Sequence, residues 1–268
     1  MTVGNPAGGL VGLPERDSGG VSFAIDVLAI GPHPDDVELF CGGTLLRLAE
    51  LGHATAVVDL TRGERASHGT PEERARETEE ASAVLGLRWR ENLGLPDTGL
   101  DAASPDQLAA VVEVLRRRRP EVLLVPWIEE RHPDHAAAGA LVAKAAFYAG
   151  VRKVETTPPS ERFTPRQLLY YPMRHRMPPT FVVDTSAVAD RKAQAVSCYR
   201  SQLGRDGTLI GSRLAWPAIE ARDRYHGSLI GVAHGEALRA PNVPGLVDPV
   251  RHFRDNPFPE AHAFEPLR

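Results

Sequence analysis

The sequence of 268 residues has few cysteines, no long apolar run and no excess of positive charge. Its two cysteines, Cys41 and Cys198, are far apart, so neither a disulfide framework nor a cysteine-based zinc module is expected, and a reducing cytoplasm is the expected compartment. No stretch approaches the roughly 20 apolar residues that cross a bilayer, so no contact with a membrane is expected. The net charge of −4 provides no overall positive field, which disfavours a nucleic-acid partner.

The N-terminal residues are rich in glycine and proline and lack the basic start and apolar core of a secretory signal. Residues 1–21 are therefore predicted to form a flexible extension. The remainder shows no internal repeat and no clear linker, so residues 22–268 are predicted to form a single domain.

Between residues 23 and 150, short apolar runs alternate with segments of helical periodicity. Strands are predicted at 23–31, 53–61, 87–94 and 121–127, and helices at 35–52, 70–86, 104–120 and 132–150. Such alternation predicts an α/β fold, a Rossmann-like and mostly parallel sheet with helices on both faces. Sheets of this type bind ligands at the C-terminal ends of their strands.

The chain after residue 150 gives a weaker pattern. Extended segments are predicted at 166–174 and 179–186, and helices at 189–204 and 213–231. The tail after residue 235 is rich in proline and is predicted to be irregular, lying along the surface or at a subunit contact.

The turn after the first strand has no G-x-G-x-x-G pattern, which disfavours a dinucleotide site. It carries His33-Pro34-Asp35-Asp36 instead, and the turn after the strand at 121–127 carries His132-Pro133-Asp134-His135. His33 and Asp36 are three residues apart, as are His132 and His135, so each pair can point the same way from the first turn of a helix.

Imidazole and carboxylate groups together suit a catalytic zinc ion. Asp35 is then placed to accept a proton from an attacking water, and His132 to stabilise an oxyanion. The alternative for a single His-Pro-Asp segment is an ordinary helix start in which the aspartate caps the backbone. Two such segments, each directly after a buried strand, favour the functional interpretation.

On these two segments the sequence resembles the PIG-L (LmbE-like) deacetylase family, which reads A-H-P-D-D-x-E at the first turn and H-P-D-H at the second. Pro32 departs from the usual alanine without removing a ligand. The resemblance covers roughly residues 24–235. The segments 59–64, 69–72 and 92–97 resemble most the branch that deacetylates N-acetylglucosaminyl-malate in bacillithiol synthesis.

The resemblance implies roles for single residues. His33, Asp36 and His135 would bind zinc, with ferrous iron as the alternative metal, and Asp35 would be the general base. His132 would act as electrophile or general acid, oriented by Asp134. Arg62 and Arg131 match positions that look like substrate contacts, and a homo-oligomer such as a hexamer is implied. For each arginine, a surface or structural ion pair is the alternative.

These patterns predict metal-dependent removal of the acetyl group from an N-acetylglucosamine conjugate, with N-acetylglucosaminyl-malate as the expected substrate. The same chemistry on a mycothiol-type pseudodisaccharide, diacetylchitobiose or an antibiotic glycoside is one alternative. A non-catalytic protein that binds a metal or a sugar is a second, and the intact Asp35 argues against it. A Rossmann-like glycosyltransferase is a third, and the histidines argue against it because magnesium and manganese prefer oxygen ligands.

Overall fold

The computed structural model describes residues 24–202 and 215–255, so the predicted extension at 1–21 lies outside the described residues. Five strands form a parallel sheet in the order β3-β2-β1-β4-β5. They are β1 (Ile25–Gly31), β2 (Thr55–Thr61), β3 (Trp89–Leu95), β4 (Pro120–Pro126) and β5 (Gln167–Tyr171). The prediction of an α/β fold with a mostly parallel sheet is confirmed.

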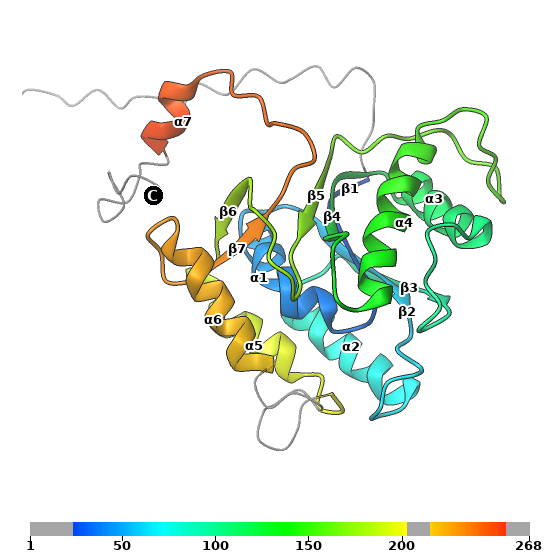
Figure 1. The fold of residues 1–268 in the computed structure, drawn as a ribbon, viewed down its shortest axis with the longest axis horizontal. Helices are drawn as coiled ribbons and strands as arrows, with labels where there is room; N and C mark the ends of the chain where they lie inside the picture. Colours follow the sequence, from blue (N-terminus) through cyan, green and yellow to red (C-terminus); the bar gives the residue numbers. More distant parts are fainter. Residues whose placement is uncertain (1–23, 203–214, 256–268) are drawn as a thin grey trace, which may run out of the picture.

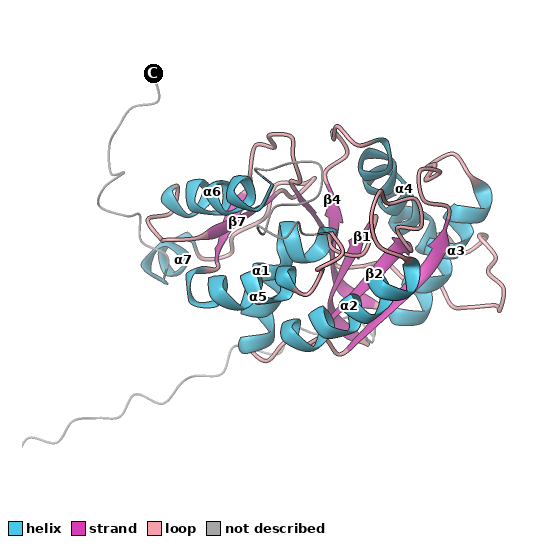
Figure 2. Cartoon of the chain, turned by 90° about the horizontal axis from the view of Figure 1, so that it is seen from below, coloured by secondary structure: helices cyan, strands magenta, loops and turns pink. Residues whose placement is uncertain are grey.

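Helices cover both faces of this sheet, as Figure 2 shows. One face carries α1 (Asp36–Glu50), α2 (Pro71–Leu85) and α5 (Ala189–Ser197), and the other carries α3 (Pro105–Arg118) and α4 (Pro133–Ala149). Successive side chains of a strand point to opposite faces. Accordingly, Leu28 and Ile30 pack into the core beneath α3 and α4, whereas Val27 and Ala29 pack beneath α1. No helix in the described part of the chain is long and apolar enough to cross a membrane.

The helix starts follow the capping residues in the sequence. The Thr70 hydroxyl accepts the backbone N–H of Glu73 at 3.1 Å, and the Glu73 carboxylate accepts the N–H of Thr70 at 2.9 Å, which forms a capping box at the start of α2. Ser104 likewise accepts from the backbone N–H of Gln107 at the start of α3. These caps place the helices directly after the turns that follow β2 and β3.

Two predictions for the second half of the chain are wrong. The helix predicted at 189–204 ends at Ser197 and continues in turns. There the carboxylate of Glu77 takes both the backbone N–H of Ser201 and its hydroxyl, at 2.7 and 2.6 Å. The tail is not irregular throughout: β7 (Gly235–Leu238) pairs antiparallel with β6 (Phe181–Asp184), and α7 (Pro249–Asp255) follows. The segment G-E-A-L has no β-branched residue, so its composition gave no strand signal.

Strand β7 ties the C-terminal region to the helix that begins at the β1 turn. Helix α1 is kinked at Cys41, where φ is −144° and ψ is 15°. At the kink, the backbone N–H groups of Gly43 and Thr44 donate hydrogen bonds to the carboxylate of Glu236, at 2.9 and 2.6 Å. A Cβ at Gly43 would lie 2.9 Å from the Glu236 Oε1 atom and 3.0 Å from the Thr185 side chain, so glycine leaves room for this close approach. Glu236 therefore acts as an internal cap for the second half of α1.

The same carboxylate belongs to a buried ionic cluster. The Lys192 ammonium of α5 lies 2.7 Å from Glu236 and also contacts the carboxylate of Asp223 on α6 (Ala215–Ser228). All three side chains are at most 6% exposed. The cluster joins α1, α5, α6 and β7, and each buried charge in it has a partner of the opposite sign.

Candidate active site

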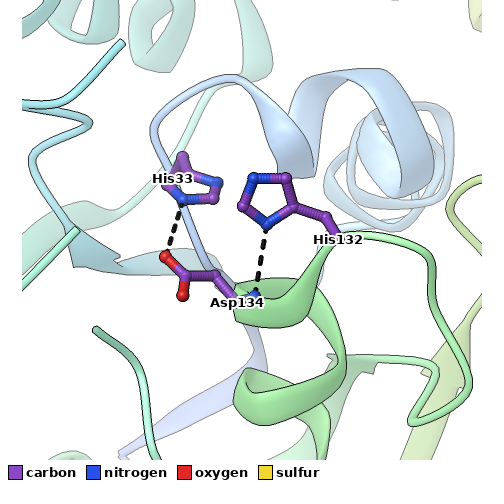
Figure 3. A group of neighbouring side chains, drawn as sticks. All are labelled: His33, His132 and Asp134. Atoms are coloured by element: carbon purple, nitrogen blue, oxygen red, sulfur yellow. Dashed lines mark hydrogen bonds and ion pairs between the residues drawn. The ribbon is translucent and has the colours of Figure 1, made fainter. Parts of the chain in front are cut away.

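The two histidine segments meet at the C-terminal edge of the sheet. His33 follows β1, and His132, Asp134 and His135 follow β4, which is the neighbour of β1 in the sheet. The ring centroids of His33 and His132 are 5.3 Å apart, and those of His132 and His135 are 4.7 Å apart. Figure 3 shows His33 and His132 facing each other across the two turns.

One carboxylate oxygen lies between two of these imidazoles. Asp36 Oδ2 is 3.1 Å from His33 Nδ1 and 3.5 Å from His135 Nε2. One ligand atom of each of these three residues lies within 4.8 Å of the others, a spacing compatible with coordination of one metal ion. His33, His132 and Asp134 form a second, overlapping group at the same spacing. The described residues thus contain a His/Asp group able to hold a metal.

The ionisation of this group follows from its burial and its neighbours. Burial raises the pKa of Asp36, but the charge of His135 and the hydrogen bond with His33 outweigh it and lower the pKa to about 2. Burial lowers the pKa of His33, yet hydrogen bonds to Asp134, Asp36 and Asp97 raise it well above its usual value. Burial dominates at His135 and lowers its pKa. Asp36 is therefore an anion between two imidazoles.

Asp35 occupies the position before α1 but does not cap the helix. Its side chain makes no capping hydrogen bond, and its φ of 118° is an uncommon value for a residue other than glycine. Burial is the main cause that raises its pKa to about 7, partly opposed by the positive charge of Arg74, whose Nη2 atom lies 3.8 Å from the carboxylate. The carboxylate is left available, with a pKa suited to proton transfer near neutral pH.

His132 is exposed at the edge of the site. Its Nδ1 atom accepts the backbone N–H of Asp134 at 3.2 Å, so the neutral ring carries its proton on Nε2 and can donate it. Asp134 thus meets the His132 ring through its backbone N–H, and the predicted orienting role of its carboxylate stays a prediction. The carboxylate lies 3.4 Å from His33 Nε2 and accepts the backbone N–H of Thr98 at 2.7 Å.

The two predicted substrate arginines are both exposed. Arg62 is exposed and lines a cavity of about 430 Å³ together with Pro34, Asp59, Arg74, Arg90 and Asn92. Arg131 is exposed next to His132. The structure thus brings together His33, Asp35, Asp36, His132, Asp134 and His135, and it places Arg62 beside the cavity.

Sequence reasoning missed Arg74 and Asp97. Arg74 donates to the backbone oxygen of Pro34 at 3.2 Å, and a Cβ at Gly63, where φ is 64°, would lie 2.5 Å from its guanidinium. An arginine near the N-terminus of a helix opposes the helix dipole, and this could have signalled a specific partner. Asp97 lies 3.3 Å from His33 Nε2, and its position directly after β3, at the same edge as the other turns, was the available signal.

The chain is similar to a known family and to a solved structure. Residues 28–146 match the family described as PIG-L: GlcNAc-PI de-N-acetylase. The solved structure of the conserved protein TT1542 from Thermus thermophilus is 43% identical, with a TM-score of 0.77 over 84% of this chain and 98% of that one.

Two curated relatives carry functional names. Diacetylchitobiose deacetylase of Thermococcus kodakarensis is 29% identical over 82% of this chain and 84% of its own length. The probable N-acetyl-alpha-D-glucosaminyl L-malate deacetylase 2 of Bacillus cereus is 28% identical over 66% and 83%. The chain therefore matches the PIG-L family over residues 28–146, and it is similar to named deacetylases along most of its length.

Proposed function

We propose that this protein is a zinc-dependent deacetylase that hydrolyses the N-acetyl group of an N-acetylglucosamine conjugate to acetate and the free amine. The observation that carries the proposal is the placement of Asp35, a half-buried carboxylate that makes no capping hydrogen bond to the helix that follows it. It lies directly beside the donor group of His33, Asp36 and His135. A protein that only bound a metal or a sugar would not need this base.

Each residue of the site has a separate role in the proposed reaction. His33, Asp36 and His135 would hold zinc or ferrous iron, which when bound polarises the amide carbonyl. Asp35 takes a proton from the attacking water and passes it to the leaving nitrogen. The Nε2–H of His132 donates a hydrogen bond to the carbonyl oxygen as negative charge develops there, and the proton stays on His132. The Asp134 carboxylate contacts His33, so in this mechanism it orients His33 and not His132.

We propose N-acetylglucosaminyl-malate as the substrate, because the site is bordered by unpaired cations. Arg131, Arg174 and Arg176 are exposed, and none of the described carboxylates pairs with their guanidinium groups. Their loops are held together, since the Glu130 carboxylate accepts the backbone N–H groups of Met173, Arg174 and His175 at 3.0–3.1 Å. Guanidinium groups bind carboxylates such as those of malate in a bidentate manner.

A comparison of substrates tests this assignment. The kcat/KM for acetate release should be higher for the malate conjugate than for the methyl glycoside of N-acetylglucosamine, and the ratio should fall in Arg131→Gln. A preference for diacetylchitobiose, a mycothiol-type pseudodisaccharide or an antibiotic glycoside would keep the chemistry and replace the substrate. Equal kcat/KM for the malate conjugate and the methyl glycoside would contradict the malate assignment.

His135→Ala is expected to lose the metal. The change removes one of three donors, so zinc measured by atomic emission after gel filtration should fall to a small fraction of the wild-type content, and acetate release should fall with it. His53→Ala is the matched control because His53 is exposed and precedes β2, at the opposite edge of the parallel sheet from the site. A His135→Ala protein that retains one zinc per chain would remove His135 from the ligand set.

We also propose that the protein is a homo-oligomer. Helix α7 and the segment before it expose several apolar side chains, among them Val243, Val247, Val250 and Phe253, and Figure 1 shows α7 apart from the sheet. Several exposed apolar side chains in one short segment of the chain are typical of a protein–protein contact surface. Sedimentation equilibrium should give a mass of several chains, reduced in Val250→Asp/Phe253→Asp, and a wild-type mass of one chain would contradict the proposal.

A further inference from the structure

The turn after β3 reaches His33 although it provides none of the proposed metal ligands. Asp97, which is 5% exposed, places its Oδ1 atom 3.3 Å from His33 Nε2. Its other oxygen accepts the backbone N–H of Arg65 at 2.7 Å, and its own N–H donates to Glu64 Oε1 at 2.8 Å. Hydrogen bonds to the turn at Glu64 and Arg65 thus fix Asp97 while its other carboxylate oxygen faces the imidazole.

The same turn fixes a second carboxylate on the same nitrogen. Asp134 Oδ2 lies 3.4 Å from His33 Nε2, and the backbone N–H groups of Thr98 and Leu100 donate to the two Asp134 oxygens at 2.7 and 3.3 Å. Thr98 has a φ of 61°, an uncommon conformation for a threonine. Strained backbone of this kind persists where the surroundings impose it, and here it lies in the turn that directs these N–H groups at Asp134.

Two ionised carboxylates at one nitrogen decide where the imidazole proton lies. Carboxylates only accept hydrogen bonds, so Nε2 must carry a proton to bind either of them. The other nitrogen, Nδ1, also faces a carboxylate, so both nitrogens of the metal-free ring can carry a proton. A metal bound on the Nδ1 side would replace the proton there and leave a neutral imidazole with its single N–H on Nε2 and its lone pair on Nδ1. Nδ1 is the atom that faces Asp36 Oδ2 at 3.1 Å, on the side of the proposed metal ligands.

We propose that Asp97 and Asp134 are positioning residues that hold His33 with its proton on Nε2 and so present Nδ1 to the metal. The inference rests on the proposed metal site. It separates the two histidine ligands, because the buried Nδ1 of His135 has no hydrogen-bond partner among the described residues. The turn after β3 therefore joins the turns after β1 and β4 as a third part of the site.

Zinc affinity gives the first test. Asp97→Asn removes the negative charge that holds the Nε2 proton. The new amide NH₂ group would also face a second donor, either the Nε2–H of His33 or the backbone N–H of Arg65. The Kd for zinc, measured by competition with a chromophoric chelator, should rise about 10- to 100-fold. Asp106→Asn, an exposed carboxylate at the start of α3, should leave the Kd unchanged. A Kd for Asp97→Asn within twofold of wild type would overturn the role of Asp97.

The second test uses the wild-type protein and does not depend on a variant that folds. Imidazole ¹⁵N spectra of the zinc-loaded protein, with His33 assigned by its loss in His33→Gln, should show a protonated Nε2 and a metal-shifted Nδ1. A metal-shifted Nε2 would overturn this inference and leave the proposed metal site in place. A His33 ring without a metal shift at either nitrogen, in protein that contains zinc, would overturn the ligand set and the inference together.

Discussion

Asp35→Asn should reduce the rate of acetate release by about 10³-fold while the zinc content stays at the wild-type level. The amide has nearly the shape of the carboxylate but cannot take the proton of the attacking water. Asparagine also tolerates positive φ better than most residues, so the backbone at φ 118° should be kept. The loss should appear in kcat and much less in KM, because the base acts in the transition state and not in substrate binding.

Three measurements make this result specific. Circular dichroism should show a folded Asp35→Asn protein, zinc analysis should give one metal per chain, and Asp101→Asn should retain full activity. Asp101 is an exposed carboxylate in the turn after β3, so its substitution controls for loss of one negative charge near the site. Wild-type turnover in Asp35→Asn would refute the assignment of the base and leave the proposed mechanism without a proton acceptor.

Glu236→Ala should cost about 3–5 kcal/mol of unfolding free energy, the loss typical of a buried charge pair broken on one side. The truncation leaves the buried ammonium of Lys192 with Asp223 alone. It also leaves the N–H groups of Gly43 and Thr44 without their acceptor at the kink of α1. Because α1 begins with Asp36, loosening of the kink should also weaken zinc binding.

The unfolding experiment requires a matched surface change. Urea denaturation at one protein concentration, followed by circular dichroism, gives the free energy of unfolding. Glu220→Ala on α6 removes an exposed carboxylate that pairs with Arg224 at 2.9 Å, and it should cost less than about 1 kcal/mol. If Glu236→Ala lost no more than Glu220→Ala, the buried cluster would not be what secures β7 to α1.

The fold of the first 150 residues could be predicted because local signals and the global arrangement agree. Apolar runs mark the parallel strands, Thr70 and Ser104 mark helix starts, and both agree with the observed elements. Strand β7 could not be predicted, since its four residues include the buried Glu236 and its pairing with β6 is set by residues more than 50 positions away. Long-range pairing and buried ionic contacts leave no local pattern.

The candidate site likewise has a part that could be predicted from the sequence and a part that could not. The sequence pointed to the turns after β1 and β4 because each combines histidine and aspartate at a spacing of three residues. Asp97 and Arg74 were missed, since each stands alone in its segment and acquires meaning only from the residue opposite, His33 for one and Asp35 for the other. The orientation of Asp134 towards His33 depends on a hydrogen bond from Thr98 that no spacing rule provides.

The central claim is that a metal held by this site drives hydrolysis of an N-acetylated sugar, and acetate release from N-acetylglucosaminyl-malate tests it most directly. The assay should compare protein loaded with zinc, the same protein stripped by a chelator, and stripped protein to which zinc is returned. The account predicts equal amounts of acetate and free amine from the loaded protein, loss of activity on stripping and recovery on return of zinc. Zinc-loaded, folded protein that releases no acetate from this conjugate or from any other N-acetylated sugar would contradict it.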